Sequence, residues 1–212
     1  FYESLGAKGW VSMKKTVDYI NNQFPEIFTI ADAKRGDIGN TSKMYAQSFF
    51  VEMNFDSVTI NPYMGSDSVK PFLEFENKIA VLLGLTSNTG ANDIQLKTTS
   101  NDNFIFMEMI KSSKEWGDKN NMMYVVGATK PGHIEKIRSL IPNHFLLMPG
   151  VGAQGGDLNE ICKYAINDNI GIIVNSSRSI IYASDDETYA SAAADQAMIL
   201  QNKMKLILSE RK

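Results

Sequence analysis

Apolar positions along the chain fall into six short, nearly continuous runs, separated by longer stretches of mixed apolar and polar residues. The runs occupy 27–34, 57–63, 79–86, 122–128, 144–151 and 170–177. Runs of this kind are typical of strands that are buried on both faces. The stretches between them show helical spacing, at 41–53, 67–75, 103–114, 131–139, 156–167 and 191–210. The alternation predicts parallel strands covered by helices.

Polar and glycine residues follow the ends of several of these runs. They are Asp32, Lys34, Asn61, Thr86, Ser87, Asn88, Pro149, Gly150, Ser176, Ser177 and Arg178. A (β/α)8 barrel builds its active site from the carboxyl ends of many strands, whereas an open doubly wound sheet uses one switch point. The pattern favours the barrel and leaves the open sheet as the alternative. The chain has no glycine-rich dinucleotide motif or P-loop, which disfavours those α/β classes.

The number of strands falls short of a full barrel. A typical barrel has eight strands and about 250 residues, whereas this chain has 212 residues and six apolar runs. The start, Phe1–Gly6, looks like the tail of a strand that runs into a helix. We therefore expect one barrel domain over 1–212, with the first two strands missing from the chain. The helix predicted at 191–210 reads as a natural C-terminus, so a fusion to another enzyme is expected on the N-terminal side.

Composition and charge narrow the function classes. The net charge of −3 gives no electrostatic basis for binding nucleic acid. No apolar run approaches the roughly 20 residues that span a bilayer. Cys162 is the only cysteine, which excludes an internal disulfide and fits a reducing, cytoplasmic compartment. We expect Cys162 to be a small buried residue.

A charged motif follows the first apolar run. Asp32 and Lys34 are two residues apart, so in a strand they point to the same face. Asp37 lies beyond the strand end, at the start of the next element. Because three charges held close together are costly without a use, the motif predicts a catalytic site.

A second motif combines glycines with a basic residue. The segment 148–157 is rich in glycine, so its backbone can approach a ligand closely and present N–H groups to it. The next apolar run ends in Asn175–Arg178, which supplies hydroxyls and a guanidinium. Because barrels often bind phosphate in their last two loops, we predict a phosphate site. The alternative is a glycine-rich turn beside a surface arginine.

Together, the segments 32–41 and 149–157 and the residue Arg178 resemble the orotidine 5'-phosphate decarboxylase family. They occur in the family's order, and the resemblance runs from the first residue to about Ala194. The chain resembles in particular the subgroup of this family whose first motif reads Asp-Ala-Lys-Arg-Gly-Asp-Ile-Gly-Asn-Thr. The resemblance implies a (β/α)8 homodimer that converts orotidine 5'-monophosphate to UMP and carbon dioxide in pyrimidine biosynthesis. It also implies that no metal or organic cofactor takes part.

The resemblance also implies roles for individual residues. Asp32 would oppose the scissile carboxylate, and Lys34 would stabilise the carbanion at C6 and then protonate it. Asp37, Ile38 and Thr41 would reach into the neighbouring subunit's site. The implied substrate-binding residues are Thr86 and Ser87 at the pyrimidine edge, Pro149 near the pyrimidine, and Gln154, Gly155, Ser177 and Arg178, of which Gln154 and Arg178 hold the phosphate.

The chain departs from the family pattern at its start. The family's ribose-binding Asp and the first Lys of its charged row should precede Phe1, so we expect the isolated chain to be inactive and poorly folded. One alternative is a magnesium-dependent sister enzyme, such as a hexulose-phosphate synthase or a keto-gulonate-phosphate decarboxylase. Ile38, Thr41 and the loop at Gln154 disfavour that reading. The other alternative is a non-catalytic nucleotide-binding protein, which the intact set of charges disfavours.

Overall fold

The computed structural model describes residues 1–128, 131–151 and 157–211, except for the side chain of Pro131. Its strands form one six-stranded sheet in the order β1-β2-β3-β4-β5-β6. The pairs β1–β2, β2–β3 and β5–β6 are parallel. The strands are β1 Ile30–Arg35, β2 Ser57–Ile60, β3 Ile79–Leu85, β4 Met122–Val126, β5 Leu146–Pro149 and β6 Ile172–Asn175.

Helices separate consecutive strands, as the sequence predicts. They are α1 Ala7–Gln23, α2 Gly39–Gln47, α3 Ser66–Leu73, α4 Ile105–Ser113, α5 Pro131–Leu140, α6 Leu158–Ala165, α7 Arg178–Ile181 and α8 Tyr189–Ser209. Three 3-10 turns, η1 Tyr2–Leu5, η3 Pro62–Met64 and η4 Thr89–Asn92, and one π turn, η2 Ser48–Glu52, complete the described elements. Each predicted strand is present but shorter than its apolar run. β1 begins three residues after the start of its run and ends one residue beyond it, whereas the other strands end before their runs do.

Two expectations about local structure are wrong. The start of the chain is the 3-10 turn η1 and not the tail of a strand. The helix predicted at 41–53 begins two residues earlier, and its second half is the π turn η2. The wider turn accompanies the burial of two consecutive aromatic residues, Phe49 and Phe50. Such π segments are rare, and hydrophobic spacing alone does not distinguish them from the rest of a helix.

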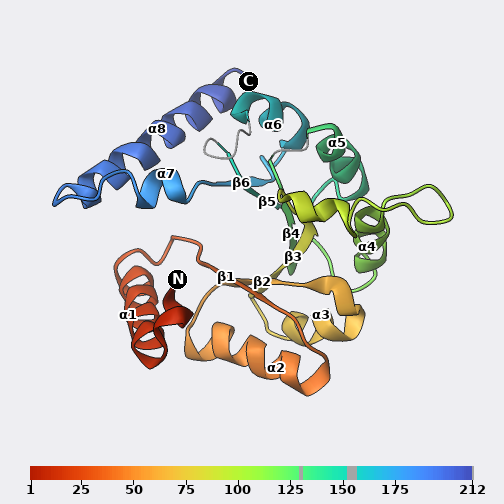
Figure 1. Cartoon of the computed structure of the whole chain (residues 1–212), viewed down its shortest axis with the longest axis horizontal. Coiled ribbons are helices and arrows are strands. Elements are labelled where there is room, and N and C mark those ends of the chain that lie inside the picture. The colour runs from red at the N-terminus through yellow and green to blue at the C-terminus, as the bar shows by residue number, and fades with distance from the viewer. Residues whose placement is uncertain (129–130, 152–156, 212) are drawn as a thin grey trace. The chain divides into compact units, whose positions relative to one another are not determined.

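The chain divides into two compact units, and each is described by itself. The first unit contains residues 1–84 and 108–124, and the second contains residues 85–107 and 125–212. In the first unit, α2 and α3 lie on the same side of β1 and β2 (Figure 1). Its fully buried core includes Phe50, Val58 and Phe72. This packing explains why the strand residues of β2 are buried on both faces.

The second unit has its own core around β5 and β6. Leu146 and Met148 of β5 are fully buried, and so are Ile134 and Ile137 of α5. Arg138, on the same helix, donates hydrogen bonds to backbone carbonyls of the loops that precede β5 and β6 and of the last residue of α6. Burial lowers the pKa of the Arg138 guanidinium to about 10. One half-buried cation thus joins the segments at the amino ends of these two strands.

Cys162 lies in α6 and is 1% exposed, which confirms the expectation of a small buried residue. Burial raises the pKa of its thiol, Arg211 lowers it, and Asp157 raises it further. Among the described helices, none combines the length and the apolar character needed to cross a membrane.

Candidate functional site

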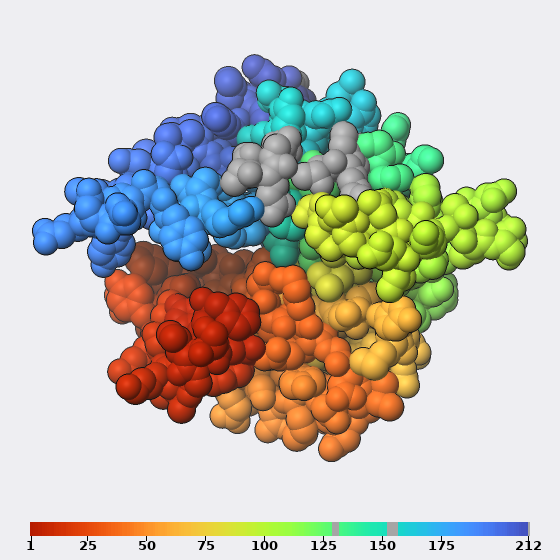
Figure 2. Space-filling model, viewed as in Figure 1, coloured from red at the N-terminus to blue at the C-terminus, as the bar shows by residue number. Residues whose placement is uncertain are grey.

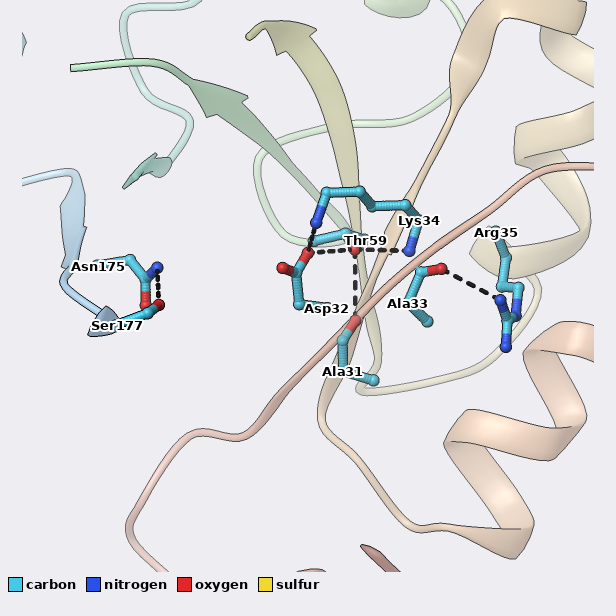
Figure 3. Close-up of polar contacts among 8 residues, drawn as sticks. All are labelled: Ala31, Asp32, Ala33, Lys34, Arg35, Thr59, Asn175 and Ser177. Carbon is cyan, nitrogen blue, oxygen red and sulfur yellow. Dashed lines mark hydrogen bonds and ion pairs between the residues drawn. The ribbon is translucent and has the colours of Figure 1, made fainter. Parts of the chain in front are cut away.

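The charged motif lies at the carboxyl end of β1, where its first two members form an ion pair. Lys34 Nζ lies 2.6 Å from Asp32 Oδ1 (Figure 3). The pairing confirms that the two side chains share a face of the strand. The side chains of Lys34 and Asp32 are 52% and 64% exposed, respectively. Both groups therefore remain in contact with solvent, which lowers the cost of holding the two charges close together.

The backbone around this pair is irregular. Ala31 of β1 pairs with Val58 of β2, and the next pair is Arg35 with Ile60. Asp32, Ala33 and Lys34 therefore lie opposite a single residue of β2, Thr59. Lys34 has φ +48°, in the left-handed region that residues other than glycine rarely adopt. Strained backbone of this kind is concentrated at functional sites.

Thr59 is a residue that the sequence analysis missed. Its side chain is fully buried. Its Oγ1 accepts a hydrogen bond from Lys34 N at 2.9 Å and lies 2.9 Å from Asp32 Oδ1 (Figure 3). A threonine in the apolar run 57–63 looks like an ordinary β-prone residue, so its spacing gave no signal. The one available signal for a functional role is a polar hydroxyl within a strand that is buried on both faces.

Arg35 lies on the other face of β1 and belongs to the structural core of the first unit. Its guanidinium pairs with Glu3 of η1. Its Cζ lies 5.5 Å from the ring centroid of Tyr45 and 5.3 Å from that of Phe49. Such cation–π contacts are stabilising. The motif therefore has two sides, because Lys34 faces the charged site while Arg35 ties β1 to neighbouring helical turns.

The third charge of the motif is placed apart from the ion pair. Asp37 lies between β1 and α2, as expected, and its Oδ1 accepts a hydrogen bond from Ile38 N at 2.7 Å. Within the described part of the chain, Lys34 forms its ion pair with Asp32 and not with Asp37. Ile38 is 53% exposed, and Thr41 is exposed on the first turn of α2. These side chains are presented outward from their own unit.

Thr86 and Ser87 follow β3 in the second unit. Gln95 holds Thr86 from two sides, because its side-chain amide donates to Thr86 Oγ1 and accepts from Thr86 N, both at 2.8 Å. Gly127, after β4, approaches so closely that an added Cβ would lie 2.8 Å from Ser87 N. Gln95 was also missed, because its role depends on the path of the segment 88–103. That segment contains η4 and projects from the surface (Figure 2).

A small cavity of about 80 Å³ lies at the carboxyl ends of β5 and β6. Its described lining consists of Pro149, Gly150, Val151, Asn175, Ser176, Ser177 and Arg178. Asn175 Nδ2 donates to Ser177 Oγ at 3.2 Å (Figure 3). Gly150 has φ +99°, a conformation that glycine adopts without strain. The structure thus brings Pro149, Ser177 and Arg178 to one cavity, whereas Gln154 and Gly155 lie outside the described residues.

Comparisons with known proteins agree with the family resemblance that the sequence motifs indicate. Residues 1–193 match the family described as Orotidine 5'-phosphate decarboxylase / HUMPS. The orotidine 5'-phosphate decarboxylase of Flavobacterium johnsoniae is 54% identical over 100% of this chain and 77% of that protein. The one of Phocaeicola vulgatus is 54% identical over 99% of this chain and 77% of that protein.

Solved structures of proteins named as orotidine 5'-monophosphate decarboxylases have a fold similar to that of this chain. The Leishmania donovani OMP decarboxylase has a TM-score of 0.81 and 32% identity, covering 92% of this chain and 74% of that chain. The Plasmodium berghei orotidine 5'-monophosphate decarboxylase has a TM-score of 0.83 and 27% identity, covering 99% of this chain and 65% of that chain. These likenesses confirm the predicted barrel fold. The alternation of strands and helices in the described residues matches this fold.

Proposed function

The chain belongs to the orotidine 5'-phosphate decarboxylase family, and on this premise we propose that it converts orotidine 5'-monophosphate to UMP and carbon dioxide. The observation that carries the proposal is the ion pair between Lys34 and Asp32 at the carboxyl end of β1. An ammonium and a carboxylate fixed side by side provide both a proton donor and a negative charge. Decarboxylation followed by protonation needs a proton donor, and the negative charge can repel the substrate's own carboxylate.

We propose that Lys34 is the proton donor. The bond between C6 and the carboxylate carbon breaks, carbon dioxide leaves, and the electron pair remains on C6. The Lys34 ammonium stabilises this developing charge more than it stabilises the substrate, so it accelerates the reaction. It then transfers a proton to C6 and becomes a neutral amine. Asp32 would oppose the substrate carboxylate, which raises the energy of the bound substrate relative to the transition state.

We further propose that Ser177 and Arg178 bind the phosphate group, together with Gln154 and Gly155. The cavity beside Arg178 and its hydroxyl lining support this assignment. A guanidinium is well suited to phosphate because it presents several N–H donors in one plane. Binding energy from a remote phosphate lowers the barrier at the reacting carbon only if it is used for positioning. Thr86, Ser87 and Pro149 are proposed to contact the pyrimidine.

A homodimer is part of the proposal. We propose that Asp37, Ile38 and Thr41 contribute to the site of a second copy of the chain. The exposure of Ile38 and Thr41 supports this, because it leaves both side chains accessible to a second copy of the chain. We also propose that residues 1–212 belong to one catalytic domain and that the reaction needs neither a metal nor an organic cofactor.

The test is the absorbance change of orotidine 5'-monophosphate when the purified protein is added in EDTA. Turnover without added metal is the result expected from the protein in its natural full length. Turnover that requires added magnesium would favour a sister enzyme of the family. Binding of UMP without turnover by that full-length protein would overturn the catalytic proposal in favour of a nucleotide-binding protein.

A further inference from the structure

The register shift between β1 and β2 leaves backbone groups of β1 without their ordinary partners in the ladder. Between the pairs Ala31–Val58 and Arg35–Ile60, three residues of β1 face Thr59 alone. A buried N–H without a partner is unfavourable. The hydroxyl of Thr59 meets this need, because Lys34 N donates to its Oγ1 at 2.9 Å.

The same hydroxyl also restrains the carboxylate of the ion pair. A threonine hydroxyl carries one hydrogen, and it can be donated to one acceptor at a time. Asp32 Oδ1 lies 2.9 Å from Oγ1, whereas Ala31 O lies 3.5 Å away, so the carboxylate is the better acceptor. Thr59 Oγ1 therefore accepts from the backbone of one charged residue and donates to the side chain of the other (Figure 3).

We propose that Thr59 is a positioning residue for the reaction, whose hydroxyl fixes the Asp32 carboxylate and the backbone of Lys34 in one arrangement. This inference rests on the proposed function. Lys34 and Asp32 are both more than half exposed, and an exposed ion pair holds two mobile side chains only weakly. Thr59 is fully buried in β2, so its hydroxyl is the rigid member of the group.

The backbone of Lys34 gives a second reason why a hydroxyl is needed. A lysine at φ +48° is unfavourable unless its surroundings hold it there. The bond from Lys34 N to Thr59 supplies such a restraint. Without it, the backbone can relax toward the ordinary β region, which redirects the lysine side chain. Because Thr59 lies behind the pair, it acts through Asp32 and Lys34 and not on the substrate.

The decisive variant is Thr59→Val, which keeps the shape of the side chain and removes the hydroxyl. We expect kcat to fall by about 100-fold, the loss typical of a small misplacement of reacting groups. KM for orotidine 5'-monophosphate and the Kd for UMP should stay near their wild-type values. Thr59→Ser, which restores the hydroxyl, should recover most of the lost kcat.

Thr29→Val is the matched control. Thr29 also accepts a backbone N–H, from Asp56 at 3.0 Å, and donates to the same residue's carboxylate at 2.8 Å. It is 7% exposed and precedes β1, away from the Lys34 pair. We expect Thr29→Val to lower the unfolding temperature but to leave kcat unchanged. An equal loss of kcat in Thr29→Val and Thr59→Val would overturn the inference, because it would show a general effect of disturbing the strands.

Other outcomes separate this inference from the proposed function. If the wild-type protein shows no turnover, the proposed function has failed, and amide exchange of the wild-type protein still tests the hydrogen bond. The Lys34 amide should be protected from exchange, and an unprotected Lys34 amide overturns the inference even if Thr59→Val does not fold. Turnover by the wild-type protein together with full kcat in Thr59→Val would overturn the inference and leave the function intact.

Discussion

Replacement of Arg138 by methionine should destabilise the protein without changing its chemistry. Arg138 donates three short hydrogen bonds, from Nη1 to His144 O at 2.7 Å, from Nε to Ala165 O at 2.8 Å and from Nη2 to Gly171 O at 2.9 Å. Two longer contacts join Nη1 to Ile141 O and Pro142 O at 3.1 and 3.3 Å. Methionine retains much of the apolar stem and removes all five donors.

The size of the effect follows from the three short bonds. Each hydrogen bond from a charged donor contributes about 1.5–3 kcal/mol to stability, and a carbonyl left buried without a partner is unfavourable. Desolvation of the guanidinium, which lowers its pKa to about 10, offsets part of this gain. We expect a net loss of about 3 kcal/mol, or about one per short bond. For a chain of this length, that corresponds to a fall in Tm of about 6–12 °C.

The assay is thermal unfolding followed by circular dichroism, with two comparison variants. Arg138→Lys keeps the charge but not the planar arrangement of donors, so it should recover less than half of the lost stability. Lys136→Met removes an exposed cation from the same helix and should change Tm little. A Tm for Arg138→Met within about 2 °C of wild type, below 1 kcal/mol, would refute the reasoning. So would an equal fall in Lys136→Met.

Three further predictions concern the site and an exposed turn. Lys34→Ala should abolish turnover and leave UMP binding within a modest factor, and equal loss of both would show a structural role. Arg178→Ala should weaken the binding of phosphorylated ligands and leave any reaction of the bare nucleoside unchanged. Equal effects on the phosphorylated and unphosphorylated substrates would contradict the phosphate assignment. Hydrogen bonds from Thr188 and Ser184 lower the pKa of the Asp186 carboxyl to about 2, so the turn before α8 gains its full stabilisation above pH 3.8 and loses it as the pH falls through about 2. An NMR titration of the Thr188 amide should show a midpoint near 2, and a midpoint near 3.8 would exclude these bonds.

The sequence was sufficient for the order of the six strands and of the helices between them. Alternation of apolar runs with helical spacing predicts each strand of the sheet, because burial on both faces requires continuous apolar residues. Spacing also places Asp32 and Lys34 on one face, because strand side chains alternate with a period of two. These predictions succeed because they depend on local geometry alone.

The sequence was not sufficient for the contacts that hold the site in place. Thr59, Gln95 and Arg138 each act through hydrogen bonds to a residue outside their own strand, helix or turn. Which hydroxyl, amide or guanidinium meets which carbonyl depends on strand register and loop path, and neither follows from hydrophobic spacing. The register shift opposite Thr59 is the clearest case, because the sequence of β2 contains no signal of an irregularity in β1.

The pairing of strands also affects how the protein can be made. Ile30 pairs with Ser57, and Ser57 in turn pairs with Ile79, so each strand joins one synthesised a single strand–helix unit earlier. Short sequence separation between contacting residues favours fast folding. A nascent chain leaving the ribosome can therefore add its strands one after another, without waiting for a distant segment. The ion pair of β1 and the buried Thr59 hydroxyl in β2 can assemble while the residues proposed to bind phosphate are still being translated.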